Sequence, residues 1–475
     1  MLFQTPTFGL FLVVVVAVAT LLDRRARLHQ GFLLLASWLF YAAWDWRFLG
    51  LILFSTVLDF YVGRAISRAP SARTRKALLL ASLVGNLGVL GLFKYYDFFV
   101  DSLNQLLGAL GFAASLPLLH LILPVGISFY TFQTLSYTID IYDGALEPRD
   151  SIVQFALFVA FFPQLVAGPI VRARQFLPQL DRRPLYDERT TGTGIYLILK
   201  GLVKKVVFAD VIGTYLVNPV FADPAGHPGF WILLAAYGFS FQIYGDFSGY
   251  SDVAIGCGRL LGYELPENFR SPFKATSFSD YWRRWHITLG SWFRDYVYFP
   301  LYSALRGGSG GPSLTLGNLS AFVTWTLIGL WHGAAWTFVI WGSLHALCLI
   351  AERIYKARVP AGPPRPWLGP LKTLGVFHAT LVATMVFRSP DVATTRRLLD
   401  AAGQATSGLG DVPAAVWLVF ALAVVTHFLP ESLKDGAESL FARSPAVVQG
   451  AAIVAVLMLL RLVGRTVEPF YYFQF

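Results

Sequence analysis

The sequence predicts an all-α protein, a polytopic bundle of helices that cross a membrane. Two observations carry this prediction. Only 14% of the 475 residues are charged, whereas an average soluble protein has about 25%, and apolar segments near the length of a membrane span recur along the chain. We expect about ten to thirteen spans, with re-entrant or interfacial helices between them, in a single membrane domain over residues 1–475.

Nine apolar segments are the strongest candidates for spans. In chain order they are 7–22, 47–66, 77–93, 151–168, 192–216, 229–248, 371–388, 413–429 and 446–464. Shorter or interrupted apolar stretches lie at 30–44, 112–138, 250–263 and 287–305. The first segment lacks the basic start and the small-residue cleavage site of a signal peptide, so we expect it to be retained as a span.

Some segments depart from a regular helix. Leu123–Gln133 and Phe162–Pro169 are apolar but contain Pro, Gly and Gln, a pattern tolerated at membrane depth only inside protein or beside a water-filled cavity. Residues 314–351 would make one helix of about 57 Å, too long for a single crossing, so we expect a bend flanked by Gly329 and Gly333. Flexible and Pro-rich connectors are expected at Gly307–Gly311 and Pro360–Pro366.

The basic residues are read as loop charges. The net charge is +10, and the clusters of Lys and Arg all fall between apolar segments, as the positive-inside rule predicts for cytoplasmic loops; we therefore expect no nucleic acid as a partner. Cys257 and Cys348 stand alone in apolar surroundings and form neither a disulfide framework nor a metal-ligand pattern, so no metal is expected.

His332 is the first candidate for a functional residue. No Asp, Glu, Lys or Arg occurs between Arg306 and Glu352, and an ionisable ring at membrane depth by default marks a functional site. On one continuous helix its face would carry Trp325, Gly329 and Trp336, with Trp331 beside it in the chain. We expect a narrow groove with rigid aromatic walls; a structural core histidine is the alternative.

His286 is the second candidate. On a helix it would share one face with Trp282, Trp285 and Leu289, while Arg283 and Arg284 point elsewhere. The segment is basic and aromatic, so it is either an interfacial helix whose arginines meet lipid phosphates, or a pocket wall in which Arg283 and Arg284 bind an anionic donor. Asp246, at the end of an apolar run, is either solvated or orients an imidazole, and Gln133 is a further pocket candidate.

Six segments in a fixed order carry a resemblance to a known family. They are Leu123–Gln133, Phe162–Pro169, Asp246–Asp252, Asn268–Pro272, Tyr281–His286 and Trp331–Trp336. The set resembles the membrane-bound O-acyltransferase (MBOAT) family, and most closely its bacterial branch of alginate O-acetyltransferase membrane subunits and teichoic-acid D-alanyl transfer proteins. The ending Glu468–Phe475 is similar to the alginate type, and the resemblance covers most of the chain.

The resemblance implies a helical bundle around a central funnel, with a catalytic core at about residues 120–350. The donor would enter from the cytoplasm and the acceptor from the other side. In the family the histidine of the Trp-His-Gly motif is the proposed catalytic residue, which is His332 here, and His286 matches the second histidine. A hydroxyl needs a base to attack a thioester, so His332 is predicted to be that base, with His286 stabilising the oxyanion or holding the donor.

These inferences predict an enzyme of the bacterial inner membrane that exports acetyl groups for O-acetylation of an exopolysaccharide, alginate-like or cellulose-like. Acetyl-CoA is the expected donor, with no tightly bound cofactor. Expected partners are membrane lipid, a periplasmic or membrane-anchored acetyltransferase of the SGNH-hydrolase type, which the aromatic C-terminal tail could contact, and the polysaccharide as final acceptor. The alternatives are D-alanyl transfer to teichoic acid and a transporter or flippase without acyl transfer.

Overall fold

The computed structural model describes residues 1–112, 115–227, 229–307, 311–359, 367–403, 413–464 and 470–471. Every regular element in these ranges is a helix, and no strand occurs within them, so the all-α prediction is confirmed. The chain divides into two compact units, one of Met1–Gly194 with Cys257–Pro266 and the other of Ile195–Gly256 with Glu267–Phe475. The prediction of one membrane domain, with a core at about 120–350, stays a prediction.

The described helices confirm a multi-pass membrane protein. By length and composition, six helical stretches among the described residues can cross a membrane, and seven can if α20 (Ala414–Phe428) and α21 (Glu431–Ala442) together make one span. Two of the six, Ala26–Arg68 and Ala72–Ala109, have 43 and 38 residues, which is about twice the ~20 residues that one crossing requires. The higher figure of ten to thirteen spans stays a prediction.

The first unit contains a buried polar contact between its central helices. Its α-helices are α1 (Pro6–Leu21), α2 (Ala26–Asp45), α3 (Leu49–Arg68), α4 (Ala72–Leu90), α5 (Tyr96–Ala109), α6 (Ile127–Tyr142), α7 (Ile152–Ala160), α8 (Phe162–Leu165) and α9 (Ala173–Phe176). Helices α3, α4 and α6 pack against one another. Asp59 on α3 accepts hydrogen bonds from Ser82 at 2.6 Å and from Asn86 at 2.8 Å, both on α4.

The two segments predicted to interrupt helices meet within this unit. Gly126 has a left-handed backbone, with φ of 78°, and α6 begins directly after it. A Cβ atom at Gly126 would lie 2.7 Å from the carbonyl oxygen of Leu165, the last residue of α8. Glycine is therefore required twice at this position, for the positive φ and for the close backbone approach.

The second unit carries the two candidate histidines. Its helices are the end of α10 (Glu188–Leu202), the π-helical stretches η4 (Val203–Asp210) and η5 (Gly213–Val217), α11 (Asn218–Ala222), most of α12 (Gly229–Leu260), α13 (Phe278–Trp282), α14 (Ile287–Phe293), the π-helical η8 (Arg294–Tyr298), α15 (Phe299–Arg306), α16 (Leu314–His332), α17 (Trp336–Arg358), α18 (Leu368–Arg388), α19 (Val392–Gly403), α20 (Ala414–Phe428), α21 (Glu431–Ala442) and α22 (Ala446–Val463). Short 3-10 turns occur in both units, and the first unit also contains the π-helical stretch η2 (Gly91–Tyr95).

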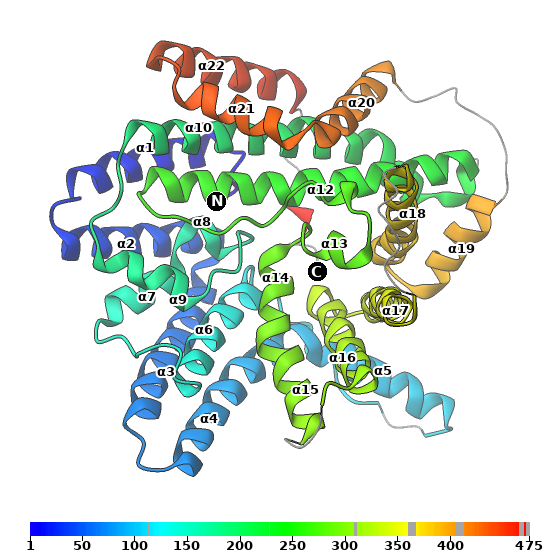
Figure 1. The fold of residues 1–475 in the computed structure, drawn as a ribbon, viewed down its shortest axis with the longest axis horizontal. Coiled ribbons are helices and arrows are strands. Elements are labelled where there is room, and N and C mark those ends of the chain that lie inside the picture. Colours follow the sequence, from blue (N-terminus) through cyan, green and yellow to red (C-terminus); the bar gives the residue numbers. More distant parts are fainter. Residues whose placement is uncertain are drawn as a thin grey trace. The chain divides into compact units, whose positions relative to one another are not determined.

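Residues 314–351 form two helices that pack side by side (Figure 1). Helix α16 ends at His332, because Gly333 is extended, and α17 begins at Trp336. A Cβ atom at Gly329 would lie 2.2 Å from the carbonyl oxygen of Phe338. The predicted interruption therefore exists, but it starts at Gly333 instead of lying between the two glycines, because Gly329 is needed for the contact between the helices.

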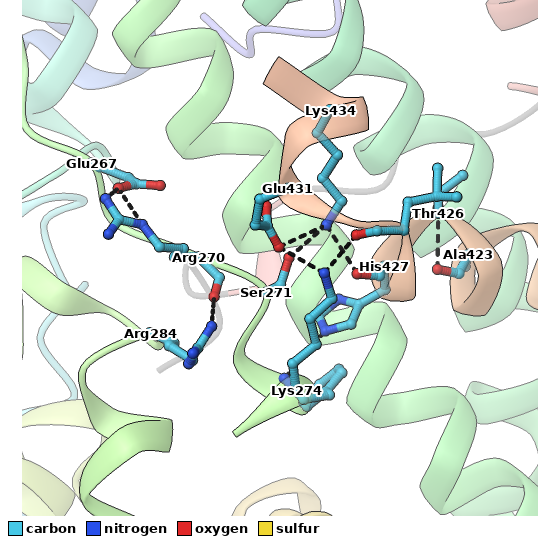
Figure 2. A network of polar contacts seen from close by, with 12 residues as sticks. Glu267, Arg270, Ser271, Lys274, Arg284, Ala423, Thr426, His427, Glu431 and Lys434 are labelled. Carbon is cyan, nitrogen blue, oxygen red and sulfur yellow. Dashed lines mark hydrogen bonds and ion pairs between the residues drawn. The ribbon is translucent and has the colours of Figure 1, made fainter. Parts of the chain in front are cut away.

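Helices α20 and α21 form a bent pair with an angle of 97°. Pro430 lies at the break, and the residue before a proline is disfavoured in helical conformation. Lys434 donates to the carbonyl oxygen of His427 at 2.9 Å (Figure 2). Lys274 donates to the carbonyl oxygen of Leu429 at 2.5 Å. These two ammonium groups satisfy carbonyl oxygens at the end of α20 that have no partner in the next turn.

Several predicted connectors lie outside the described residues. They include residues 308–310 of the predicted Gly307–Gly311 loop, the whole of Pro360–Pro366, and positions 468–469 and 472–475 of the C-terminal segment. Phe470 and Tyr471 of that segment are described, and both are buried within the second unit. These two aromatic residues are therefore not an exposed contact surface for a partner, which corrects that part of the expectation.

Candidate active site

His286 lies in a sharp turn between two short helices. Ser277 caps α13, and the chain then turns, so that His286 precedes α14 with a left-handed backbone, φ 41°. The prediction of one helix face through Trp282, His286 and Leu289 is therefore wrong. A non-glycine residue with positive φ is uncommon and is retained only where the surrounding structure holds it.

Asn268 fixes the tautomer of His286. The Asn268 Oδ1 atom lies 3.1 Å from Nδ1 of His286 and also accepts from the backbone N–H of Thr288 at 3.3 Å. Because a backbone N–H can only donate, the Asn268 atom in this position must be the oxygen. Nδ1 of His286 therefore carries the proton and donates to it, which leaves a lone pair on Nε2 in the neutral ring.

His286 is fully buried, and burial lowers its pKa to about 3, because the charged ring loses its hydration. Nε2 is buried and has no hydrogen-bond partner within the described ranges of the chain. The ring is thus neutral near pH 7, with an unshared acceptor. This tautomer presents no N–H at Nε2, so it does not suit the predicted role of stabilising an oxyanion, which requires a donor.

His332 is the last residue of α16 and is surrounded by aromatic rings. Its ring centroid lies 5.0 Å from those of Trp331 and Trp341, and 5.5 Å from that of Phe387 on α18. The side chain is buried at the point where α16 breaks. The predicted rigid aromatic surroundings are therefore present, although two of the three rings come from α17 and α18.

The two histidine rings lie next to each other within the second unit. Their centroids are 6.4 Å apart, with the ring planes inclined at 56°. Trp331 is adjacent to both rings, at 6.0 Å from His286 and 5.0 Å from His332. Phe247 of α12 packs edge-on against His286 at 4.6 Å. Residues from α12, the 267–287 segment, α16, α17 and α18 thus build one buried aromatic site around two imidazoles.

Asp246 has partners other than an imidazole. It forms an ion pair with Lys205 at 2.6 Å and accepts a hydrogen bond from the backbone N–H of Tyr471 at 2.8 Å. Lys205 is also paired with Asp210 at 2.8 Å. The residue that orients His286 is Asn268, which is an amide. Asp246 was one candidate for this role in the sequence, but its partners in the structure are Lys205 and Tyr471.

The remaining predicted site residues are distributed unevenly. Trp285 and Trp331 are buried in the site, whereas Trp336 opens α17 and is 56% exposed, because the break at Gly333 turns it away from the predicted face. Gln133 belongs to α6 of the first unit and is fully buried, and its amide has no hydrogen-bond partner in the described ranges.

The two arginines predicted to bind the donor lie at the turn before His286. The Arg283 side chain is 73% exposed, and Arg284 is held by Asp280 at 3.0 Å. Figure 2 shows Arg284 contacting the carbonyl oxygen of Arg270, and shows Lys274 and Lys434 gathered around Glu431. This part of the second unit is rich in cations and only partly buried.

Sequence reasoning missed Asn268, Trp341 and Phe387. Asn268 was noted only as part of a matching segment, and nothing in the spacing links it to a histidine 18 residues later. Pro272, which follows Asn268 closely, was the available signal, since a proline there favours a turn in the chain. Trp341 and Phe387 reach the site through packing between helices, for which one sequence holds no signal.

Comparison with known proteins identifies the family. The model of the MBOAT, membrane-bound O-acyltransferase family matches residues 148–385, which include both histidines. The chain belongs to the membrane-bound O-acyltransferase family. It is 38% identical to a protein of Pseudomonas aeruginosa named probable alginate O-acetylase AlgI, over 84% of this chain and 74% of that protein. This O-acyltransferase thus has a relative of the predicted alginate type.

Two further relatives bear other names. A peptidoglycan O-acetyltransferase of Helicobacter pylori is 37% identical over 68% of this chain and 64% of its own length. A teichoic acid D-alanyltransferase of Bacillus subtilis is 29% identical over 56% of this chain and 69% of its own length. The membership favours an enzyme over the transporter alternative, and the relatives named for O-acetylation are the more similar ones.

Proposed function

We propose that this O-acyltransferase of the bacterial inner membrane moves acetyl groups from acetyl-CoA for O-acetylation of an exopolysaccharide, alginate-like or cellulose-like. The observation that carries the proposal is the pair of buried imidazoles 6.4 Å apart, in a chain 38% identical to a protein named alginate O-acetylase. Neutral imidazole is the side chain best suited to accept a proton near pH 7.

The proposed step uses His332 as the general base. The acceptor hydroxyl oxygen attacks the carbonyl carbon of the thioester while His332 takes the hydroxyl proton. A C–O bond forms, the C–S bond breaks, and the proton passes from His332 to the departing sulfur, which leaves as the thiol of coenzyme A. The buried aromatic surroundings of His332 exclude water, which limits hydrolysis of the thioester.

His286 is proposed to hold the donor. With Nδ1–H bound to Asn268, the Nε2 lone pair is able to accept an N–H, such as an amide N–H of the pantetheine arm. Arg283 and Arg284 are proposed to meet the donor phosphates, and the exposure of Arg283 fits that role. In this proposal, a periplasmic or membrane-anchored partner of the SGNH-hydrolase type completes the transfer to the polysaccharide.

The test compares three substitutions of histidine by asparagine in the purified chain in lipid nanodiscs. They are His332→Asn, His286→Asn and, as the control, His120→Asn; asparagine tolerates the positive φ that both His286 and the exposed His120 adopt. Release of coenzyme A from acetyl-CoA is followed with acceptor present. Loss of a general base costs about 10²–10⁴-fold, so we expect a fall of that size for His332→Asn.

His286→Asn is expected to raise the KM for acetyl-CoA more than it lowers kcat, while the control keeps the wild-type rate. If His332→Asn kept the full turnover rate, His332 would not be the general base. A parallel assay with a D-alanyl thioester on a carrier protein tests the D-alanyl alternative, and a rate above that with acetyl-CoA would favour it.

A further inference from the structure

Arg353, near the end of α17 in the second unit, is a half-buried cation without an anionic partner. Its guanidinium donates to Oδ1 of Asn318 on α16 at 3.3 Å and lies over the ring of Tyr298, 5.8 Å from the ring centre. Among the described residues, no carboxylate pairs with this guanidinium. A guanidinium carries five N–H donors, so this side chain keeps donors for a ligand.

The acidic residues beside Arg353 and its aromatic partner along the chain are paired with other cations. Asp295 forms an ion pair with Arg294 at 2.7 Å, and Glu352 forms one with Lys356. Neither carboxylate therefore serves as the counter-ion of Arg353. Half-buried charges are normally paired, so this cation needs an anion from outside the chain.

Three side chains converge on one point of α16, at Gly317. A Cβ atom at this point would lie 3.3 Å from Nη1 of Arg353, 3.4 Å from the hydroxyl oxygen of Tyr298 and 3.8 Å from the ring of Tyr302. The rings of Tyr298 and Tyr302 are nearly parallel, with their centroids 6.2 Å apart. Glycine adds no side chain here, and it therefore allows the guanidinium and both tyrosines to meet on this face of α16.

The groups around the guanidinium are also able to donate hydrogen bonds. The hydroxyl of Tyr302 accepts the backbone N–H of Ser313 at 2.9 Å, so its own O–H is left to donate. The hydroxyl of Tyr298 has no hydrogen-bond partner in the ranges that the structure describes. A guanidinium only donates, so the atom of Asn318 that faces it is the oxygen, and the NH2 group is left to donate. Such a set of donors fits an anion with several acceptor oxygens, such as a phosphate.

The cluster lies at the ends of two membrane helices. Helices α16 and α17 are both long and apolar enough to cross a membrane, and they pack side by side. The start of α16 therefore lies beside the end of α17, with α15 next to them (Figure 1). The ends of spans lie near the head groups of the bilayer, and the N-terminal end of a helix favours anions through its dipole.

Exposed apolar side chains stand close to the cluster along the same helices. Those with exposed fractions of 43–63% are Phe299, Leu305, Leu314, Leu319 and Tyr355. Phe299 directly follows Tyr298, and Leu319 directly follows Asn318. Exposed apolar surface at the end of a span contacts lipid acyl chains. A phosphate that carries acyl chains of its own therefore matches this place better than free phosphate or coenzyme A does.

We propose that Arg353, Tyr298, Tyr302 and Asn318 bind the head-group phosphate of an anionic phospholipid such as phosphatidylglycerol. The lipid supplies the counter-ion that the chain lacks at Arg353, and it links η8 and α15 to the ends of α16 and α17. The proposal does not depend on the proposed function, because it concerns a site at the lipid-facing end of these helices.

The test measures binding of dioctanoyl phosphatidylglycerol to the full chain in detergent. The rise in melting temperature with lipid concentration gives an apparent Kd. Arg353→Met is expected to weaken this Kd by about tenfold or more, because a hydrogen-bonded charge is lost. Tyr298→Phe removes a hydroxyl without a partner among the described residues, and it should weaken the Kd by about threefold.

Arg396→Met is the matched control, since it removes an arginine from an exposed ion pair with Asp400 on α19, and it should keep the wild-type Kd. Equal values of Kd for Arg353→Met and Arg396→Met would overturn the site. If Arg353→Met does not fold, Tyr298→Phe decides, and a wild-type Kd for it would overturn the site.

Titrations of the wild-type chain with dioctanoyl phosphatidylcholine, inorganic phosphate and coenzyme A test the occupant. Phosphatidylcholine should bind at least tenfold more weakly than phosphatidylglycerol, and equal binding would overturn the anionic head group. A stabilisation by inorganic phosphate or by coenzyme A that Arg353→Met or Tyr298→Phe removes would overturn the lipid as the occupant.

Discussion

Asn268 accepts a hydrogen bond from Nδ1 of His286, and that single contact decides what the other side of the imidazole offers to a ligand. The amide is itself anchored, since Thr288 donates to its Oδ1 through both the backbone N–H and the hydroxyl group, the latter at 2.9 Å. The other end of the amide donates to Ser251 of α12 at 3.3 Å. One side chain thus ties together the turn that carries His286, the start of α14, and α12.

The first prediction concerns Asn268. Asn268→Leu removes the acceptor and frees the His286 ring, so we expect at least a tenfold loss in kcat/KM for acetyl-CoA. Asn268→Asp keeps an acceptor for Nδ1 and adds a negative charge, which raises the pKa of His286. Profiles of kcat/KM against pH check this: Asn268→Asp should retain more activity than Asn268→Leu, and its acid limb should move to higher pH.

The second prediction links His286 to stability in acid. The pKa of His286 is about 3 in the folded chain, and the ordinary value is 6.5. Between these two pH values the ring is protonated in the unfolded chain but not in the folded chain. The buried neutral ring therefore makes its full contribution to the free energy of unfolding above pH 6.5. As the pH drops below 6.5, the free energy of unfolding falls by up to about 1.4 kcal/mol per pH unit. The ring of His332 lies next to that of His286, with the two ring centroids 6.4 Å apart.

Thermal unfolding of the wild-type chain and of His286→Asn between pH 4 and 8 measures this effect. The difference in melting temperature between the two should narrow steadily below pH 6.5, since the substituted chain has no ring to protonate. A difference that does not change with pH would show that burial of His286 does not perturb its pKa.

The third prediction concerns the contact between α16 and α17. Gly329→Ala places a methyl group 2.2 Å from the carbonyl oxygen of Phe338, so the helices must separate next to His332. Overpacking of this kind costs about 1–3 kcal/mol. Gly375→Ala on α18, where a Cβ atom meets nothing within 4 Å, is the control. A loss of thermal stability and of activity is expected only for Gly329→Ala, and equal behaviour of the two variants would contradict the argument.

The fourth prediction concerns the bend between α20 and α21. Lys434 contacts the carbonyl oxygen of His427, the hydroxyl of Ser271 at 2.6 Å and the carboxylate of Glu431 (Figure 2). Lys434→Met leaves the first two groups without this donor, so we expect a loss of about 1–3 kcal/mol in stability. Arg396→Met breaks an exposed ion pair and should change stability by less than about 1 kcal/mol.

Unfolding of both variants in detergent gives the comparison. The effect of Lys434→Met should persist at high salt, because the contacts are short and partly buried, whereas any effect of Arg396→Met should disappear. If both variants match the wild-type chain, the bend does not depend on the lysine.

The sequence by itself determined the all-α membrane class, because charges are few and the repeated apolar segments have about the length at which a helix crosses the bilayer with its backbone hydrogen bonds satisfied. It also singled out His332, an imidazole in a long uncharged stretch, and His286, an imidazole in a basic segment rich in tryptophan. The helical periodicity of the sequence gave wrong predictions where helices end. It predicted one helix face through His286, where the backbone has a positive φ, and another through Trp336, which the extended Gly333 separates from α16.

Only the tertiary structure decided which atoms face each other. The tautomer of His286 depends on Asn268, and the surroundings of His332 depend on Trp341 and Phe387. These pairs are separated along the chain and meet through helix packing. The free energy of packing depends on shape and on contacts between distant side chains, and a single sequence carries no periodic signal for them.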